Sequence, residues 1–428
     1  MEHSMRYDIA VLGGGFTGCA AAIASARQGK RVILLEASGF LGGAASNCLI
    51  FPFMCYSTPV TDENGEVHRH YLSRGILGEI VREMQATGDI RGDSQFNDEA
   101  LKILLDRMTT EAGVEVLFHA TLCGVKKTGN RIESLSVATK AGVLTFEAQV
   151  FVDCTGDADL CAMAKIPTTL GREPDHLCQP MTLCFRVANV DKKKFFENRP
   201  LWVRLHKEWK EAGRFTNPRE DILVFDYPMD GMLHFNTTRV VRRNPVDPFD
   251  VTKAEMEARR QVQELLNFFR ANNMPGMENA RLVYTAPSIG VRESRMLVGD
   301  YVLTGRDLVA CVKFPDAVAA GNYDIDIHNP EGSGTSHYYF PAGTWYTIPY
   351  RSLIPKREDC VNLLVGGRCI SCDHEAQASI RIIPICTTTG EAAGIGASVA
   401  LDGNGTVQDA DVARIQGIIG ETGGYTGL

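Results

Sequence analysis

The stretch YDIAVLGGGFTGCAAAIASARQGKRVILLE, residues 7–36, decides the fold of this chain. Residues 7–12 and 31–35 are short apolar runs that predict two buried strands, and the alanine-rich residues 17–28 predict a helix between them. A strand, a glycine turn, a helix and a second strand, in this order, are typical of a parallel βαβ unit. The sequence therefore predicts an α/β fold with a Rossmann-like sheet.

The glycine turn GGGFTG at residues 13–18 fits the pattern G-x-G-x-x-G, directly after a predicted strand and at the start of a predicted helix. Gly13 permits a tight turn, Gly15 lets the backbone approach a pyrophosphate, and Gly18 lets the helix pack closely on the strand. N–H groups at the start of such a helix bind phosphates, so the turn predicts a dinucleotide site. A glycine turn in an unrelated α/β protein is the alternative. The residues that open the helix are Phe16 and Thr17.

Four turns at strand ends indicate a long ligand, because open α/β sheets bind ligands at the carboxyl ends of their strands. Besides the first turn they are Gly42-Gly43, residues 155–157 (TGD) and residues 366–368 (GGR). Glu36 ends the second predicted strand, where a carboxylate accepts hydrogen bonds from ribose hydroxyls and repels a 2′-phosphate. The pattern favours FAD and disfavours NADP.

Composition narrows the classes of function. The net charge of −8 provides no basic stripe for a nucleic acid, and the basic cluster from Arg239 to Arg243 is interpreted as a solvated face. The thirteen cysteines are odd in number and form no disulfide framework, and no second ligand pair with zinc spacing occurs, so no metal site is predicted. No leader peptide and no uncharged run of about 18 residues is found. We therefore expect no membrane span and a cytoplasmic location.

The pattern changes in the middle of the chain, where strand-like residues 181–187 are combined with a long amphipathic helix at about residues 252–272. The apolar strand followed by glycines returns near residue 362. A chain of 428 residues is long enough for two domains. We expect residues 1–166 and 342–428 to form a discontinuous FAD-binding domain and residues 167–341 an inserted α+β substrate domain.

The chain resembles the FAD-dependent oxidoreductases of the glutathione-reductase-like superfamily, near the fumarate reductase and succinate dehydrogenase flavoproteins. Within that branch it looks most like a bacterial group usually called simply FAD-dependent oxidoreductase. The NADPH-binding disulfide reductases of the superfamily carry a second glycine fingerprint in mid-chain, and none is found here, so bound reduced nicotinamide is not expected. The segments that carry the resemblance are DIAVLGGGFTGCAAA, LLEASGFLGG, VFVDCTGDADL, APSIGVRESRMLVGDYVLT, YDIDIHNPEG, YTIPYRSLIP and NLLVGGRCISCDHEAQASIRIIPICTTTGEAAG.

The resemblance implies a place on FAD for individual residues. Glycines 13, 15 and 18 would hold the pyrophosphate and Glu36 the adenosine ribose, while Leu122 would touch the adenine through its backbone. Amides that open the last helix, at about residues 386–389, would face the pyrimidine edge of the flavin, where a helix dipole stabilises negative charge. The other residues carried over by position are Ala37, Gly42, Gly43, Thr155, Gly156, Asp157, Gly367, Arg368, Thr387 and Thr388.

Candidate catalytic residues lie in the segments that resemble the family. His328 is the candidate base and Asp326 would orient it, because residues two apart lie on one face of a strand. Arg292, Arg295 and Arg381 would clamp a carboxylate through their planar guanidinium groups. The alternative is that these arginines pair with neighbouring acids and that the histidine is only a structural hydrogen-bond partner.

The predicted function is that of an FAD-dependent oxidoreductase, which transfers a hydride between a small organic substrate and the bound flavin. A carboxylate is the candidate substrate, and the electron acceptor or donor is not predicted. One alternative is a dithiol-flavin enzyme that uses the C-x-x-C pair Cys369 and Cys372. The other alternative is a flavin-binding protein without catalysis.

Overall fold

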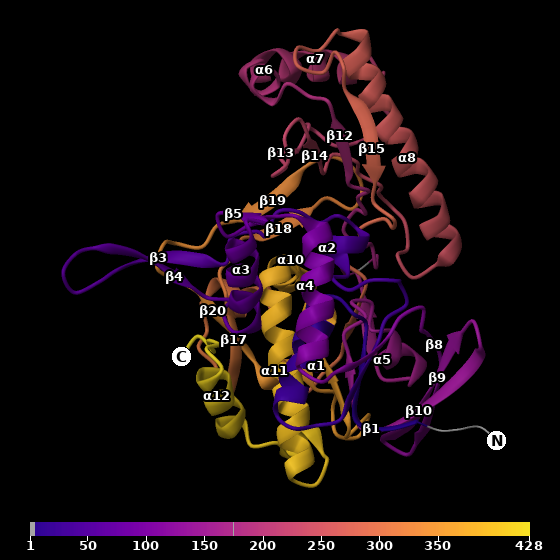
Figure 1. The fold of residues 1–428 in the computed structure, drawn as a ribbon, viewed down its shortest axis with the longest axis vertical. Helices are drawn as coiled ribbons and strands as arrows, with labels where there is room; N and C mark the ends of the chain where they lie inside the picture. Colours follow the sequence, from indigo (N-terminus) through magenta and orange to yellow (C-terminus); the bar gives the residue numbers. More distant parts are fainter. Residues whose placement is uncertain (1–4, 174) are drawn as a thin grey trace.

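The computed structural model describes residues 5–173 and 175–428 (Figure 1). Among these residues, the central sheet has seven strands, five of them parallel. This arrangement confirms the α/β fold with a Rossmann-like sheet. The parallel strands, in spatial order, are β7 (Glu115–Leu117), β2 (Val32–Leu35), β1 (Met5–Leu12), β10 (Gly142–Asp153) and β21 (Leu363–Val365).

Strand β10 pairs with three strands, β9, β1 and β21. Its first half pairs with β9 (Arg131–Thr139) in antiparallel register, and β9 pairs in turn with β8 (Thr121–Thr128). Its second half lies between β1 and β21, so that Leu12 faces Asp153 and Asp153 faces Val365. The turns that follow these strands therefore meet at one edge of the sheet.

Helices α1 (Phe16–Arg27) and α11 (Ile383–Asp402) lie side by side along the sheet, in the centre of Figure 1. Small residues let their backbones approach. A Cβ atom on Gly390 would lie 2.2 Å from the carbonyl oxygen of Thr17, and one on Gly394 would lie 2.2 Å from that of Ala21. Both helices thus begin at the same edge of the sheet.

The middle of the chain builds a second layer, in the upper part of Figure 1. Its antiparallel sheet is covered by α8 (Pro248–Ala271), which begins four residues before the predicted start because Asp247 caps it and Pro248 occupies its first turn. Buried residues between Met181 and Ile289 form a hydrophobic cluster of their own, whereas Met296 and later buried residues join the larger cluster. The boundaries at residues 167 and 341 stay a prediction. The sheet runs β13 (Val224–Asp226), β14 (Leu233–Phe235), β12 (Phe185–Ala188) and β15 (Arg281–Thr285), with α6 (Lys192–Glu197) and α7 (Arg199–Glu211) beside it.

Two antiparallel hairpins belong to neither of these sheets. β18 (Ile325–His328) pairs with β19 (Thr335–Tyr338), and β3 (Ser57–Thr61) pairs with β4 (Val67–Tyr71) in an arm that projects from the body (Figure 1). Over the described ranges, no helix is long and apolar enough to cross a bilayer. The remaining elements are α2 (Ala44–Asn47), α3 (Ile76–Thr87), β5 (Ile90–Arg91), β6 (Gln95–Phe96), α4 (Asp98–Glu111), α5 (Asp159–Met163), β11 (Thr168–Leu170), β16 (Arg295–Leu297), α9 (Gly305–Val309), β17 (Ala317–Gly321), β20 (Tyr346–Pro349), α10 (His374–Ile380) and α12 (Val412–Glu421).

Candidate active site

A cavity of about 970 Å³ lies where the parallel strands end and the second layer begins. It brings together most residues that the sequence analysis selected, from segments far apart in the chain. Of the candidate catalytic residues, Arg292, Asp326, His328 and Arg381 line it, whereas Arg295 does not. The predicted cofactor residues in the lining are Gly13, Gly15, Phe16, Thr17, Glu36, Ala37, Gly42, Gly43, Leu122, Thr155, Gly156, Asp157, Gly367 and Arg368.

The first glycine turn forms a backbone cradle at one part of the cavity. A Cβ on Gly13 would lie 2.5 Å from the carbonyl oxygen of Cys154, and this residue has a φ of +91° that favours glycine. A Cβ on Gly15 would meet nothing closer than Gly43 Cα, at 3.6 Å, because its Cα faces the open cavity. Among the described residues, no side chain caps α1 and no acid lies in its first turn. The first N–H groups of α1 are therefore available to an anion.

Gly18 lies behind the cradle, outside the cavity lining. A Cβ on this residue would lie 1.8 Å from the carbonyl oxygen of Gly13. Gly18 therefore acts by letting α1 approach β1, which is the packing role that the motif predicts for it.

Glu36 is held rigidly at the end of β2. Its Oε2 accepts a hydrogen bond from the Gly14 N–H at 2.6 Å, and its Oε1 accepts one from the Ser38 N–H at 2.7 Å. The side chain lines the cavity beside Ala37. The sequence-based position for a ribose contact thus lies next to the glycine cradle.

The start of α11 differs from the expectation. Ile382 is its N-cap and Ile383 its first residue, so the helix begins before residues 386–389, whose amides were expected to open it. Ile382, Ile383 and Cys386 line the cavity, whereas Thr387 and Thr388 are buried one turn further along the helix. The placement of Thr387 and Thr388 at the helix start is therefore wrong. Proline in the first turn of α11 was the available sequence signal, because proline is favoured there.

Arg368 and Asp157 form an ion pair on the cavity wall. Arg368 Nη2 donates to Asp157 Oδ1 at 2.6 Å, and its other terminal nitrogen donates to the carbonyl oxygen of Val291. Arg295 lies behind this pair, where its Nε donates to the carbonyl oxygen of Asp157 at 2.8 Å and its Nη2 pairs with Asp159. Arg295 therefore fits the ion-pair alternative in this structure, and it does not reach the cavity.

A second polar group in the lining centres on Asp326 and His328. Arg239 Nη2 donates to His328 Nδ1 at 2.9 Å, and because a guanidinium only donates, the neutral ring carries its proton on Nε2. That nitrogen lies 3.3 Å from Asp326 Oδ2, which also accepts a hydrogen bond from Arg381 Nη2 at 3.2 Å. Burial, together with the positive charge of Arg292, lowers the pKa of His328 to about 3. Burial alone would raise the pKa of Asp326, but the hydrogen bond with His328 and the charge of Arg381 bring it below its ordinary range.

Four guanidinium groups surround this pair, and three of them are paired with an acid: Arg219 with Asp221, Arg239 with Glu220 and Arg381 with Asp326. The fourth, Arg292, is half-buried in the lining and donates to the Pro180 carbonyl oxygen at 2.6 Å and to Thr182 Oγ1 at 2.5 Å. It makes no ion pair within residues 5–173 and 175–428, and burial with the nearby positive charges of Arg381 and Arg219 lowers its pKa to about 9. Among the described residues, Arg381 Nε and Arg219 Nη1 are buried in the protein without a hydrogen-bond partner, although both guanidinium groups have an acid partner. Arg292 is therefore the guanidinium of this group whose charge is open to an anion.

Sequence analysis missed two of these arginines. Arg219 and Arg239 are 6% and 1% exposed, so the interpretation of Arg239 as part of a solvated face is wrong. The chain buries Arg239 because Glu220, His328 and the carbonyl oxygens of Gly332 and Gly334 satisfy its N–H groups. No local sequence signal reports partners that lie about a hundred residues away.

The C-x-x-C pair lies outside the cavity lining. Cys369 and Cys372 are free thiols and fully buried, and their sulfur atoms contact the Gly366 carbonyl oxygen and Met296 Sδ. Burial raises the pKa of both thiols well above their ordinary range. A buried thiol without thiolate character is unreactive, which counts against the dithiol alternative.

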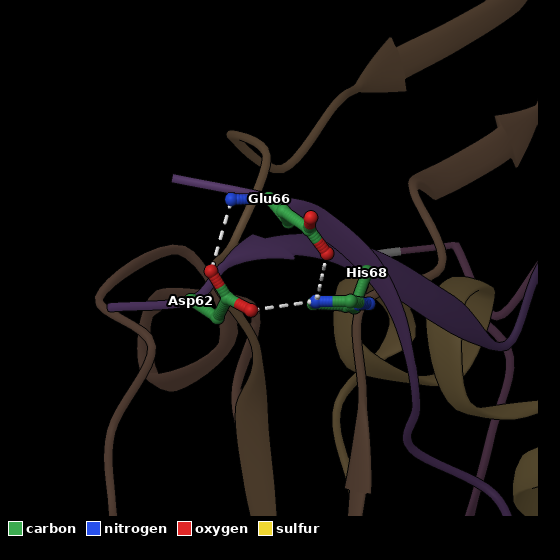
Figure 2. Close-up of side chains that lie close together, drawn as sticks. All are labelled: Asp62, Glu66 and His68. Carbon is green, nitrogen blue, oxygen red and sulfur yellow. Dashed lines mark hydrogen bonds and ion pairs between the residues drawn. The ribbon is translucent and has the colours of Figure 1, made fainter. Parts of the chain in front are cut away.

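The tip of the β3–β4 hairpin holds a separate cluster of Asp62, Glu66 and His68, shown in Figure 2. His68 Nε2 lies 2.7 Å from Asp62 Oδ2 and 3.8 Å from Glu66 Oε2. Asp62 Oδ1 accepts hydrogen bonds from the N–H groups of Asn64 and Glu66, both at 2.9 Å. These contacts close the turn of the hairpin and account for the cluster.

A family model described as FAD dependent oxidoreductase matches residues 8–419. The chain belongs to this family. It is an oxidoreductase and its cofactor is FAD, as predicted. The chain's own residues fit the cofactor of the FAD dependent oxidoreductase family, since the backbone cradle at Gly15 and the uncapped start of α1 face the same cavity as Glu36.

Three solved structures similar to this member of the FAD dependent oxidoreductase family share 12% to 14% identity with it. A geranylgeranyl bacteriochlorophyll reductase-like protein from Thermoplasma acidophilum has 12% identity and a TM-score of 0.48, over 98% of this chain and 84% of that one. The myxobacterial chondrochloren halogenase CndH has 14% identity and a TM-score of 0.44, over 98% of this chain and 79% of that one. The p-nitrophenol 4-monooxygenase PnpA from Pseudomonas putida DLL-E4 has 12% identity and a TM-score of 0.37, over 69% of this chain and 70% of that one. No curated protein matches the chain.

Proposed function

We propose that this enzyme transfers a hydride between FAD and a small organic carboxylate, on the branch near the fumarate reductase and succinate dehydrogenase flavoproteins. The observation that carries the proposal is Arg292, a guanidinium without an acid partner among the described residues, which lines the cavity that also holds the glycine cradle. We propose residues 167–341 as the substrate domain, because Arg219, Arg239 and Arg292 all come from that range.

The cofactor would be held by the cradle and by the starts of α1 and α11. The α1 N–H groups would bind the pyrophosphate, Glu36 would bind the adenosine ribose, and the N–H groups of Ile383 and Ile385 in the first turn of α11 would stabilise negative charge at the flavin. Bound FAD supplies a two-electron acceptor or donor that exchanges a hydride with the substrate. The remaining predicted cofactor contacts, from Gly42 to Arg368, extend along the same cavity wall.

The substrate carboxylate would be bound by Arg292 and Arg381. Arg292 has no carboxylate partner among the described residues, and its charge and that of Arg381 repel each other. A carboxylate bound beside them offsets this repulsion. Asp326 holds Arg381 in place through its Oδ2.

Removal of the substrate proton needs a free lone pair next to the bound substrate. On His328 the Nδ1 lone pair accepts from Arg239, and Nε2 carries the ring proton. Asp326 belongs to the cavity lining, and its Oδ1, buried in the wall 3.8 Å from His337 Nε2, accepts no hydrogen bond within the described residues. We therefore propose that Asp326 takes the proton and His328 orients it, which reverses the roles that the sequence predicts for this pair.

The test begins with the absorbance spectrum of the purified, desalted protein and identification of the flavin released on denaturation. The holoenzyme is then mixed anaerobically with a panel of carboxylates and with the amide of each, and bleaching of the flavin is recorded. We expect carboxylates to bleach it and the amides not to. A colourless protein that FAD does not reconstitute would refute the cofactor site, and equal bleaching by the amides would refute the anion site.

Variants separate binding from proton transfer. Arg292→Gln should raise KM for the carboxylate about 10- to 150-fold, the loss of a charged hydrogen bond of about 1.5–3 kcal/mol, and leave FAD bound. Asp326→Asn should lower kcat instead. Arg204→Gln, a substitution of a 65% exposed arginine on α7, is the matched control and should change neither constant.

A further inference from the structure

One strand of the second layer presents two faces of different character. Within β13 and just before it, Val224 and Ile222 pack into the hydrophobic cluster of the second layer. Leu223 and Phe225, which alternate with them, are half-buried and line the cavity. Successive side chains of a strand point to opposite faces, so this short segment turns an apolar surface toward the cavity.

The loop after α2 adds apolar surface of its own to the cavity. Ile50 and Pro52 are half-buried and Met54 is 36% exposed, and all three line the cavity. Phe51 meets Phe225 edge to face, with ring centroids 6.3 Å apart and an interplanar angle of 84°. Apolar side chains that are partly exposed to water in a cavity favour binding of a ligand that covers them.

The same strand segment carries a charge at its beginning. Arg219 lines the cavity four residues before Leu223, and its Nη1 is buried without a hydrogen-bond partner in the described parts of the chain. Its Nε donates to Asp221 Oδ1 at 2.7 Å, so this guanidinium is already paired with an acid. What the segment offers to a ligand is therefore its apolar surface.

We propose that the substrate is an amphipathic carboxylate, whose charged end lies at Arg292 and Arg381 and whose apolar body lies on Leu223 and Phe225. This inference rests on the proposed function and adds a substrate class to it. Small polar acids would leave Leu223 and Phe225 uncovered. An apolar body gains about fourfold in affinity for each methylene group that it buries, from about 0.8 kcal/mol per group.

The test measures binding without turnover, through the change that a ligand causes in the flavin spectrum of the holoenzyme. The probes are acetate, butyrate, hexanoate and phenylacetate, with phenylacetamide as the uncharged counterpart. We expect Kd to fall about fourfold per added methylene along the aliphatic series, and phenylacetate to bind while phenylacetamide does not. Equal affinity of acetate and hexanoate, or no binding by any of these acids, would overturn the inference.

Two variants locate the apolar surface. Leu223→Ala and Phe225→Leu should weaken hexanoate and phenylacetate several-fold and leave acetate and FAD unchanged. Val283→Ala removes a 53% exposed side chain from β15 in the same sheet and should have no effect. Unchanged hexanoate affinity in both cavity variants would overturn the inference. Bleaching by a small polar acid would still support the proposed function, so the two failures are distinguishable.

Discussion

Gly15→Ala is the sharpest test of the cofactor cradle, because the structure separates its effect on FAD from its effect on the fold. Gly15 has φ −69° and ψ −179°, which alanine adopts without strain, and the nearest atom to its added Cβ is Gly43 Cα at 3.6 Å. The stability of the apoprotein should therefore change by less than about 1 kcal/mol. The methyl group would instead project into the cavity, where the pyrophosphate approaches the backbone.

An extra methyl group in a packed contact costs about 1–3 kcal/mol, so the Kd for FAD should rise about 5- to 150-fold. The assay is titration of FAD into apoprotein, followed by flavin fluorescence, with thermal unfolding of the apoprotein alongside. Gly417→Ala is the matched control, because its Cβ would meet nothing within 4 Å on α12, and it should leave the Kd unchanged. A wild-type Kd in Gly15→Ala would refute the cradle.

Three further predictions follow from buried groups. Gly18→Ala should lower the melting temperature with or without FAD, because its Cβ would lie 1.8 Å from the Gly13 carbonyl oxygen; an unchanged melting temperature would contradict this packing. Burial raises the pKa of Glu391 to about 7, above its ordinary 4.5, so its contribution to stability is present below about pH 4.5 and is lost as the pH rises through 7. Urea unfolding should show this loss as about 3 kcal/mol, and Glu391→Gln should remove it; the same pH dependence in the variant would be the contrary result. Replacement of Cys369 and Cys372 by serine should preserve flavin reduction by substrate, whereas loss of reduction in a folded, FAD-loaded variant would restore the dithiol alternative.

The cofactor part of the site could be predicted because its signals are local. Residues 13–18 combine a strand end, a turn and a helix start within one short motif, and Glu36 ends the next strand. Each later turn also follows an apolar strand directly. Parallel pairing of β1, β10 and β21 then brings turns more than 300 residues apart to one edge of the sheet. Topology rules for open α/β sheets are enough to anticipate that convergence.

The substrate part could be predicted only in fragments, because its charge balance is a property of tertiary contacts. Arg295 and Arg292 are three residues apart in the sequence and belong to the same motif, yet only Arg292 reaches the cavity, since Asp159 holds Arg295 behind the wall. Arg239 is indistinguishable in sequence from its exposed neighbour Arg242, yet it is 1% exposed.

What selects one arginine for burial is the set of acceptors that the fold brings to it. Arg239 receives Glu220 from its own layer and His328 from the β18–β19 hairpin, and both must be in place before its charge can be buried without a large cost. The guanidinium in turn fixes the tautomer of His328, which leaves Asp326 Oδ1, buried in the cavity wall, without a hydrogen-bond donor among the described residues. The assignment of the base therefore depends on an arginine from the second layer, and the sequence order of Asp326 and His328 cannot decide it.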